Sequence, residues 1–177
     1  MHGAAAALAR APAAPAPAAD YTGAMAAAVT GVSVVTTDGA GGRMGLTVSS
    51  TASVSADPPT LLVCIRRSSP IVPRIRAHGT FAVSILGVDQ AAIADTFAGR
   101  PADGAPYDFA AARWETGVTG APLLAGAAAT FDCVVASTVE AATHTVVIGE
   151  VVQAARGAGP ALAYTDRRYA APGPLPG

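Results

Sequence analysis

The sequence predicts a mainly β domain, an antiparallel barrel with short helices at its ends. Two observations support this fold class. About seven short runs of β-branched or alternating apolar residues indicate strands, whereas only three segments carry helix-start or helix-stop signals. The links between strands are more often of hairpin length than long enough for a crossover helix, which favours antiparallel pairing and closure into a barrel.

Each predicted element has a local signal. Strands are placed where apolar residues alternate or run together, and helices where an aspartate or a proline can occupy the first turn. The first predictions, in chain order, are a helix over 21–29 capped by Asp20, a strand over 32–37, a strand from Gly45, a buried strand over 60–65, a helix over 71–77 after Pro70, a strand over 80–86, and a helix from a cap at Asp89 to about Ala98. The remaining predictions are an irregular segment over 99–112, a short strand at Trp114, two long strands over 130–140 and 143–153 around Ala141-Ala142, and a last strand over 162–165.

The segment after the Gly45 strand is predicted to be a hydroxyl-rich connection. Its short hydroxyl side chains are those of Ser49, Ser50, Thr51, Ser53 and Ser55. Asp57-Pro58-Pro59 ends it, because proline offers no N–H group to a strand ladder. Many small donors beside open backbone suit a phosphate group and the polar edge of a ring. The alternative is a hydroxyl-rich turn without a ligand, since loops are commonly rich in these residues.

Composition limits the class of partner. The chain has 177 residues, enough for one domain with a real core, and a formal net charge of −1. This charge implies no broad attraction to nucleic acid or to anionic lipid. All eleven basic residues are arginines. Any anion-binding charge must therefore be a guanidinium, which can engage a phosphate bidentately.

The ends and the cysteines suggest a cytoplasmic protein with one domain over 20–170. Cys64 and Cys133 lie in apolar strand-like runs, which favours buried free thiols over a disulfide. No apolar run reaches the ~18 residues of a membrane span. Residues 1–19 are rich in alanine and proline and lack the unbroken apolar centre of a signal peptide, so a disordered tail is expected there, and a flexible tail over 171–177.

Several common motifs are not found in the sequence. The glycines over 39–45 lie between two predicted strands rather than before a helix, which argues against a dinucleotide-binding turn. A phosphate loop ending in Gly-Lys-Ser/Thr is excluded because the chain has no lysine, and no Gly-x-Ser-x-Gly elbow occurs. His2, His78 and His144 are far apart and no Cys or His pair has metal-ligand spacing, so no metal site is expected.

The order and spacing of several short motifs over residues 21–170 resemble the flavin reductase family with the FMN-binding split barrel. These are small NAD(P)H:flavin oxidoreductases that supply reduced flavin to two-component monooxygenases. The motifs are Thr30-Gly-Val-Ser-Val-Val-Thr-Thr37, Gly45-Leu-Thr-Val-Ser-Ser50, Ser53-Val-Ser-Ala-Asp-Pro-Pro59, Leu62-Val-Cys64, Ser68-Ser69, Gly79-Thr-Phe-Ala-Val-Ser-Ile-Leu86, Ala94-Asp-Thr-Phe-Ala-Gly99, His144-Thr-Val-Val-Ile-Gly-Glu-Val151 and Tyr164-Thr-Asp-Arg-Arg-Tyr169. The resemblance implies an antiparallel Greek-key split β-barrel, FMN or FAD as the flavin, NADH or NADPH as the reductant, a homodimer, and transient transfer of reduced flavin to an oxygenase component.

The resemblance also implies the site residues. Those expected at the flavin are Gly45, Leu46, Thr47, Val48, Ser49, Ser50 and Ser53 along its ring and ribityl chain, Cys64, Ile65 and Arg66 at the dimethylbenzene or ribityl side, Arg67, Ser68 and Ser69 at the phosphate, and Phe97, Gly99 and Arg100 where the family closes the site. His144 is expected beside the nicotinamide as the catalytic residue, and Tyr164, Asp166 and Arg167 at NAD(P)H. One departure is Ala142-Thr143, where the family often has Gly-Asp.

Without the resemblance, these residues have simpler explanations. His144 could be a hydrogen-bonded residue at a strand start, Arg66-Arg67 solvated charge at a strand end, and Cys64 a packing residue. An FMN-binding electron carrier without pyridine nucleotide is the main alternative function, because the fold alone permits it. An oxidase of the pyridoxamine-phosphate type is a third. In the preferred hypothesis hydride passes from C4 of the nicotinamide to N5 of the flavin, and the protein mainly orients the two rings.

Overall fold

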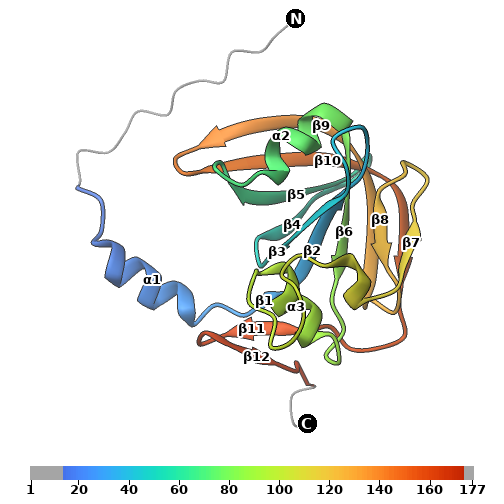
Figure 1. Cartoon of the computed structure of the whole chain (residues 1–177). Coiled ribbons are helices and arrows are strands. Elements are labelled where there is room, and N and C mark those ends of the chain that lie inside the picture. The colour runs from blue at the N-terminus through green and yellow to red at the C-terminus, as the bar shows by residue number, and fades with distance from the viewer. Residues whose placement is uncertain (1–13, 174–177) are drawn as a thin grey trace, which may run out of the picture.

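The computed structural model describes residues 14–173, and strands are its most abundant secondary structure (Figure 1). The helices are α1 (Ala18–Ala26), α2 (Ile71–His78), α3 (Ala91–Phe97) and the short 3-10 helix η1 (Phe109–Ala111). The strands are β1 (Thr30–Gly31), β2 (Ser33–Thr37), β3 (Met44–Val48), β4 (Thr51–Ala56), β5 (Pro59–Arg66), β6 (Thr80–Ile85), β7 (Trp114–Thr116), β8 (Pro122–Leu124), β9 (Ala129–Ala141), β10 (His144–Arg156), β11 (Ala163–Thr165) and β12 (Arg168–Ala170). Of the tails predicted over 1–19 and 171–177, residues 1–13 and 174–177 lie outside the described residues.

The main sheet has seven strands in the order β3-β2-β6-β9-β10-β5-β4, and every pairing in it is antiparallel. Its order is not a simple meander, because the chain crosses from β5 to β6 through α2. The two end strands, β3 and β4, are consecutive in the chain and are joined through Ser49 and Ser50. The sheet therefore wraps around one interior, and the mainly β antiparallel fold class is confirmed (Figure 1).

The interior of this sheet is filled by the apolar residues that alternate inward along its strands. The cluster comprises Val35, Val48, Leu61, Val63, Ile65, Ile71, Val72, Ile75, Phe81, Val83, Cys133 and Val147, all at most 8 % exposed. Full burial of one such side chain stabilises the fold by about 1.5–3 kcal/mol. Pro70 precedes α2 as predicted, and α2 ends at Gly79, whose φ of 69° lies in the left-handed region. The inner face of α2 closes one side of the interior.

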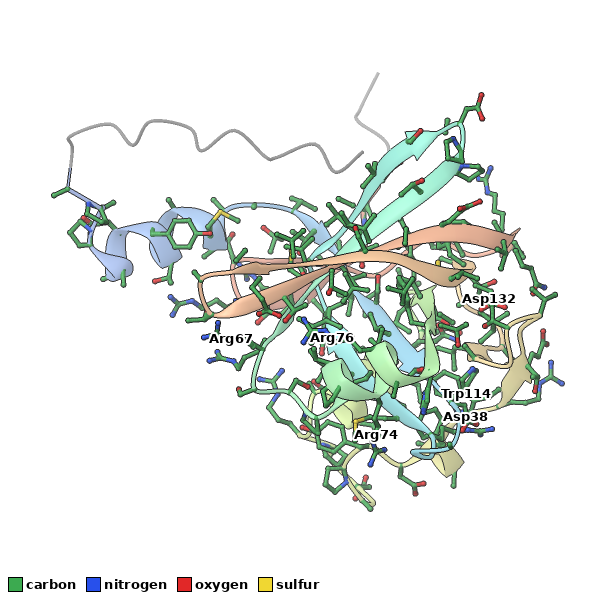
Figure 2. All side chains as sticks on the ribbon, turned by 90° about the horizontal axis from the view of Figure 1, so that it is seen from above. Asp38, Arg67, Arg74, Arg76, Trp114 and Asp132 are labelled. Carbon is green, nitrogen blue, oxygen red and sulfur yellow. The ribbon has the colours of Figure 1, made fainter. Side chains whose placement is uncertain are left out.

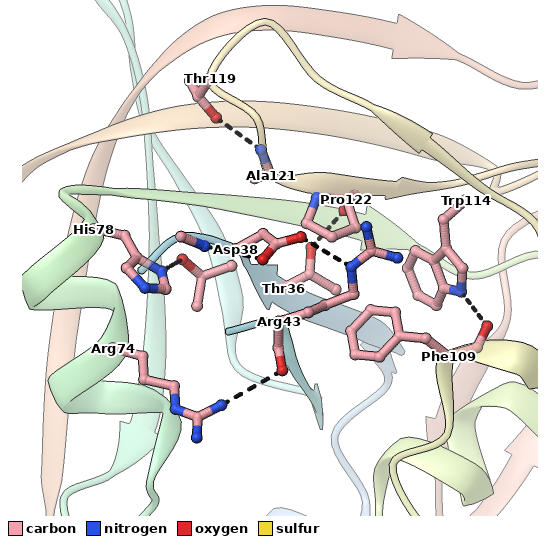
Figure 3. A network of polar contacts seen from close by, with 12 residues as sticks. Thr36, Asp38, Arg43, Arg74, His78, Phe109, Trp114, Thr119, Ala121 and Pro122 are labelled. Atoms are coloured by element: carbon pink, nitrogen blue, oxygen red, sulfur yellow. Dashed lines mark hydrogen bonds and ion pairs between the residues drawn. The ribbon is translucent and has the colours of Figure 1, made fainter. Parts of the chain in front are cut away.

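A second apolar cluster lies between β2, α3 and the C-terminal hairpin β11–β12. Phe97 is fully buried there and packs edge-on against the rings of Phe109 and Trp114, with centroids 5.0 and 5.4 Å away. Gly45 of β3 makes this packing possible, because a Cβ at that position would come within 2.7 Å of the Phe97 ring. The indole N–H of Trp114 donates to the carbonyl of Phe109 at 2.9 Å, and the Arg43 guanidinium covers the Phe109 ring (Figure 3). This cluster packs against β3 at Gly45.

Two predicted helix starts were wrong. α1 begins at Ala18, inside the segment predicted to be a tail, and Asp20 lies in its first turn without capping it. Proline at position 17 sets the entry geometry instead. α3 begins after Gln90 rather than after Asp89, because the Gln90 side chain accepts a hydrogen bond from the Gly87 N–H and donates one to the carbonyl of Ala125. The hydrogen bonds of the Gln90 side chain to residues outside the helix therefore set the start of α3.

The hydroxyl-rich connection is in fact strand β4, so the prediction of a loop over this segment was wrong. Thr51 and its neighbours alternate along an end strand that pairs with β5, where hydroxyl side chains face solvent at little cost. Strands β1, β8 and β12 were not predicted, because two or three residues carry too weak a pattern. The long hairpin turns at Ala142-Thr143, one residue later than predicted, with Ala142 at φ 49°. Within residues 14–173 no helix combines the length and the apolar character needed to cross a bilayer.

Candidate functional site

A groove of about 560 Å³ opens where β3, β5 and the start of β10 meet. It is lined by Leu46, Thr47, Val48, Ser49, Ser50, Cys64, Ile65, Arg66, Ser69, Pro70, Tyr107 and His144. β3 and the residues after it form one side, β5 and β10 form another, and the loop before α2 and the loop before η1 complete it. Ten of these twelve residues were predicted at the site from the resemblance, so the fold brings together residues that are distant in sequence.

The hydroxyl groups on the β3 side hold the backbone in place. Thr47 donates through Oγ1 to the carbonyl of Ala94 at 2.7 Å, which ties β3 to α3. Ser50 donates through Oγ to the carbonyl of Cys64 at 2.7 Å, and the Cys64 N–H donates back to the Ser50 carbonyl at 3.2 Å. These two hydroxyls therefore offer lone pairs rather than protons to a ligand. β3 is also an end strand of the sheet, so one of its edges has no strand partner.

The β5–β10 wall presents side chains that the register places opposite each other. His144 lies across from Arg66, and Val146 across from Cys64, on the face turned away from the barrel interior. Thr145 and Val147, which alternate with them along β10, are fully buried. The Nδ1 atom of His144 lies 2.9 Å from the Thr143 hydroxyl. This contact orients the imidazole and leaves Nε2 for a ligand.

Arg66 and Arg67 have different surroundings although they are adjacent. Arg66 lines the groove, whereas Arg67 lies 3.9 Å from the Glu140 carboxylate, which also pairs with Arg76 of α2 and accepts from Thr145. Figure 2 shows Arg67 and Arg76 beside the tip of the β9–β10 hairpin. The hydrogen bond from Arg76 is the main reason why the pKa of Glu140 is lowered. Arg67 therefore helps to hold the hairpin, and Arg66 is the groove's guanidinium.

The turn between β5 and α2 places Ser69 at the groove. Its N–H donates to the Arg66 carbonyl at 2.8 Å, so the turn folds back over the strand end. Pro70 and the first turn of α2 follow, and the free N–H groups of a helix start favour an anion. Ser68 is exposed in the same turn and does not line the groove. Arg66 and Ser69 are the best-placed pair for a phosphate.

Two smaller pockets adjoin the groove through Thr47, Val48, Ser49 and Ser50. One, of about 220 Å³, is lined by Arg100, Tyr164 and Tyr169 among others. The other, of about 420 Å³, lies between α1, Tyr164 and Arg167. The Tyr169 hydroxyl donates to the Asp95 carboxylate at 2.8 Å, and burial followed by this bond raises the pKa of Tyr169 to about 12. The groove thus continues toward the C-terminal hairpin.

Several residues predicted at the site lie elsewhere in the structure. They are Gly45 and Phe97 in the second apolar cluster, Ser53 in a separate pocket beyond β4, Arg67 and Ser68 beside the groove, Gly99 beneath the Tyr107 ring, and Asp166 at the β11–β12 turn. The Asp166 N–H donates to the carbonyl of Ala26, and its carboxylate lies 3.9 Å from Arg168. Gly45 and Phe97 support the floor of the groove without reaching it.

The structure adds Pro70 and Tyr107 to the groove and Tyr169 to the adjoining pocket. Sequence reasoning missed Tyr107 because it lies in a segment without periodicity, and no signal in the sequence could have found it. In the part of the chain that the structure covers, no three His, Cys, Asp or Glu side chains are grouped as a metal site would require.

Comparison with known proteins gives one consistent result. The family described as "Flavin reductase like domain" matches residues 25–173. A protein of Ancylobacter novellus called "FMN reductase (NADH) RutF" is 45 % identical over 151 residues, which are 84 % of this chain and 82 % of that protein. The NADH:FAD oxidoreductase SgcE6 of Streptomyces globisporus, solved with NAD and FAD fragments, is 33 % identical at a TM-score of 0.80 and covers 89 % and 93 % of the two chains. BorF, the flavin reductase component of a bacterial two-component tryptophan halogenase, is 33 % identical at a TM-score of 0.78 and covers 88 % and 98 %.

Proposed function

This chain belongs to the flavin reductase family, and on that premise we propose that it reduces a flavin with NADH and supplies the reduced flavin to a separate oxygenase component. The relatives are named for both parts of this function: NADH-dependent FMN reduction and service to a two-component system. The net reaction consumes NADH, a proton and oxidised flavin and yields NAD⁺ and reduced flavin. The flavin supplies the hydride-accepting chemistry when it is bound.

The observation that carries the proposal for this chain's own residues is the groove itself. It combines an open strand edge, an orienting histidine and a guanidinium within one volume of about 560 Å³. Sites for drug-sized ligands span about 300–1,000 Å³, so this volume fits a planar ring with a side chain. Side-chain hydrogen-bond donors are few on the β3 side, because the hydroxyl groups of Thr47 and Ser50 already donate to backbone carbonyls. The backbone from Leu46 to Ser50 is therefore assigned to the ring and ribityl chain.

Arg66 and Ser69 are assigned to the flavin phosphate. Arg66 is exposed and lines the groove, and its side chain has the forked geometry that matches phosphate oxygens. Ser69 adds a hydroxyl at the start of α2. The Glu140 carboxylate pairs with Arg67 and Arg76, and no ion pair of Arg66 is found among the described residues. Positive charge at Arg66 thus stays available for an anion.

His144 is assigned to the nicotinamide carboxamide. If its Nδ1 donates to Thr143, then Nε2 accepts from the carboxamide NH₂; if Nδ1 accepts, Nε2 donates to the carboxamide oxygen. Either tautomer is complementary to an amide, which has one donor and one acceptor end. The residue binds and orients, and the hydride step needs no side-chain acid or base. Tyr164 and Arg167, in the adjoining pocket, are assigned to the rest of the pyridine nucleotide.

One spectrophotometric measurement tests the function. NADH oxidation is followed at 340 nm with catalytic FMN or FAD in air, and then with NADPH, which gives steady-state constants for all four flavin–nucleotide pairs. Turnover with NADH is expected. Flavin binding without NADH oxidation would favour the electron carrier, and neither binding nor oxidation would refute the proposal.

We also propose a homodimer in which each site is completed by the partner subunit. α1 supports this, because none of its residues is buried within the chain and Tyr21 and Met25 are 62 % and 49 % exposed. α1 contributes to the pocket beside the groove, so a partner that covers the helix would also close that pocket. Light scattering coupled to size exclusion tests this, and a fully active monomer would contradict it.

A further inference from the structure

Tyr107 has an unusual backbone conformation. Its φ is 60°, in the left-handed region that aromatic residues rarely adopt. The other non-glycine residues with positive φ among residues 14–173 are Ala142, Asp166 and Arg167, and all three lie in two-residue hairpin turns, which require that conformation. Tyr107 lies in no hairpin but follows Pro106 in a turn, at the position where a turn with positive φ usually has glycine or asparagine. Such a conformation costs about 1–3 kcal/mol and is found most often at functional sites, so it calls for a reason.

The surrounding chain holds Tyr107 in this conformation. Its N–H donates to the carbonyl of Thr96 at 3.0 Å, which fixes the backbone to the end of α3. Its ring lies over Gly99, where an added Cβ would come within 2.5 Å of the phenolic oxygen and 3.0 Å of Cζ. Gly99 itself has a φ of 75°. A hydrogen bond and a glycine therefore together set the place of this one ring.

The hydrogen bond to Thr96 and the contact with Gly99 hold the Tyr107 ring at a wall of the groove. Tyr107 lines it together with Thr47 on the β3 side and with Cys64, Arg66 and His144 on the β5–β10 side. Tyr107 and His144 provide the two aromatic rings among the lining residues. Tyr107 is 48 % exposed, so much of its ring is open to a ligand rather than packed in the core. The site thus has an aromatic face on a loop as well as a polar face on strands.

We propose that Tyr107 is a positioning residue whose ring packs against the planar heteroaromatic ring of the ligand in the groove. This inference rests on the proposed function, since the two planar ligands are the flavin and the nicotinamide. Aromatic surfaces attract one another in offset or edge-on contact, and the contact also excludes water from the groove. The Pro106-Tyr107 turn sets the backbone conformation, and an aromatic residue at this position places a ring where the ligand would lie.

The test compares Tyr107→Asn with Tyr107→Phe. Asparagine tolerates the left-handed conformation and lacks the ring, whereas phenylalanine keeps the ring and loses only the hydroxyl. Flavin affinity is measured without NADH by the change in flavin fluorescence on titration with protein. The KM for NADH is measured separately at saturating flavin, so the two arms identify which planar ring is contacted. Thermal unfolding of each variant is recorded in parallel.

We expect Tyr107→Asn to weaken flavin binding or raise the KM for NADH by about three- to tenfold, the loss of one aromatic pair, while the Tm stays equal or rises. Tyr107→Phe should stay within about twofold of the parent in both arms. A purely structural Tyr107 would lower the Tm and leave both constants unchanged, which would overturn the inference. It would also be overturned if phenylalanine lost as much affinity as asparagine.

Two further outcomes are distinguishable. If Tyr107→Asn does not fold, Tyr107→Leu keeps the bulk without the aromatic face, and the same weakening is expected of it. If the parent protein oxidises NADH with flavin but the ring-free variants match it in both arms, the inference fails and the proposed function stands. If the parent protein neither binds nor reduces flavin, the proposed function fails first and this inference with it.

Discussion

His144 and Arg66 lie directly opposite each other on β10 and β5, and both side chains line the groove. Opposite residues of an antiparallel pair have Cβ atoms about 4.5–5.5 Å apart, so the two functional groups share one end of the wall. Arg67, one residue along, turns to Glu140 instead. A shift of the register by one residue would place either the buried Ile65 or Arg67 opposite His144 instead of Arg66.

Replacing His144 with alanine should raise the KM for NADH. The loss of one neutral hydrogen bond, about 0.5–1.5 kcal/mol, corresponds to a rise of about two- to twelvefold. The kcat should fall less than kcat/KM, because the residue orients the nicotinamide rather than transferring a proton. Steady-state kinetics checks this. His78→Asn is the matched control, since His78 bonds to Thr37 and Gly41 away from the groove. An unchanged KM for NADH in His144→Ala would contradict the assignment.

Replacing Arg66 with alanine should weaken FMN binding and leave riboflavin binding unchanged. Riboflavin lacks the phosphate, so the comparison isolates the charge contact. A hydrogen bond to a charged group contributes about 1.5–3 kcal/mol, which predicts a loss of about 10- to 100-fold for FMN alone. Fluorescence titration with both flavins measures it. Arg113→Ala is the control, because Arg113 is 83 % exposed and pairs with Glu115 beside β7. If Arg66→Ala weakened the binding of FMN and riboflavin equally, Arg66 would not bind the flavin phosphate.

Cys64 provides a footprint of the groove that does not depend on catalysis. The chain has two cysteines, and Cys133 is fully buried with its pKa raised to about 12, so it should not react with a disulfide reagent such as DTNB. Cys64 lines the groove and should react. At a flavin concentration ten times the Kd, labelling should slow by about tenfold, because only the free protein reacts. Cys64→Ser should abolish labelling. If flavin did not slow the labelling of Cys64, the flavin would not bind against the β5–β10 side of the groove.

Gly45→Ala should destabilise the fold from beneath the groove. Its Cβ would come within 2.7 Å of the Phe97 ring and 3.3 Å of Phe109, and overpacking of this kind costs about 1–3 kcal/mol. Urea unfolding monitored by Trp114 fluorescence measures the change. Gly31→Ala is the matched control, because no atom lies within 4 Å of its added Cβ. If the two variants were equally stable, Phe97 would not pack on β3 as described.

Acid should loosen the β9–β10 hairpin that carries His144. The hydrogen bond from Arg76 lowers the pKa of Glu140 in the folded protein below the ordinary range of a glutamate. A carboxyl group with a lowered folded pKa contributes stability above its unfolded pKa and loses that contribution as the pH falls through the folded value. Glu140→Gln should therefore be less stable than the parent at pH 7, with the gap closing below about pH 4. Urea midpoints at both pH values check this, and a gap independent of pH would contradict it.

Much of the fold could be predicted because the signals are local. The run over β5 and the alternation of β6 follow from inward-facing apolar residues, and Gly79 and Gly99 end their helices in the left-handed conformation. The failures also have local causes. Hydroxyl residues in β4 suggest a loop unless a partner strand is known, and a capping aspartate cannot be told from Gln90 without the loop that Gln90 binds.

The sequence by itself determined most of the strands, the family, and most of the residues of the groove, because these depend on short-range periodicity and on motifs in a set order. Only the tertiary structure decided which of them share a surface. It packed Phe97 inward against Gly45, paired Arg67 with Glu140, and brought Tyr107 from an irregular loop into the groove that Cys64 and Arg66 also line. Strand register and the packing of distant segments are set by burial over the whole chain, and no local pattern encodes them.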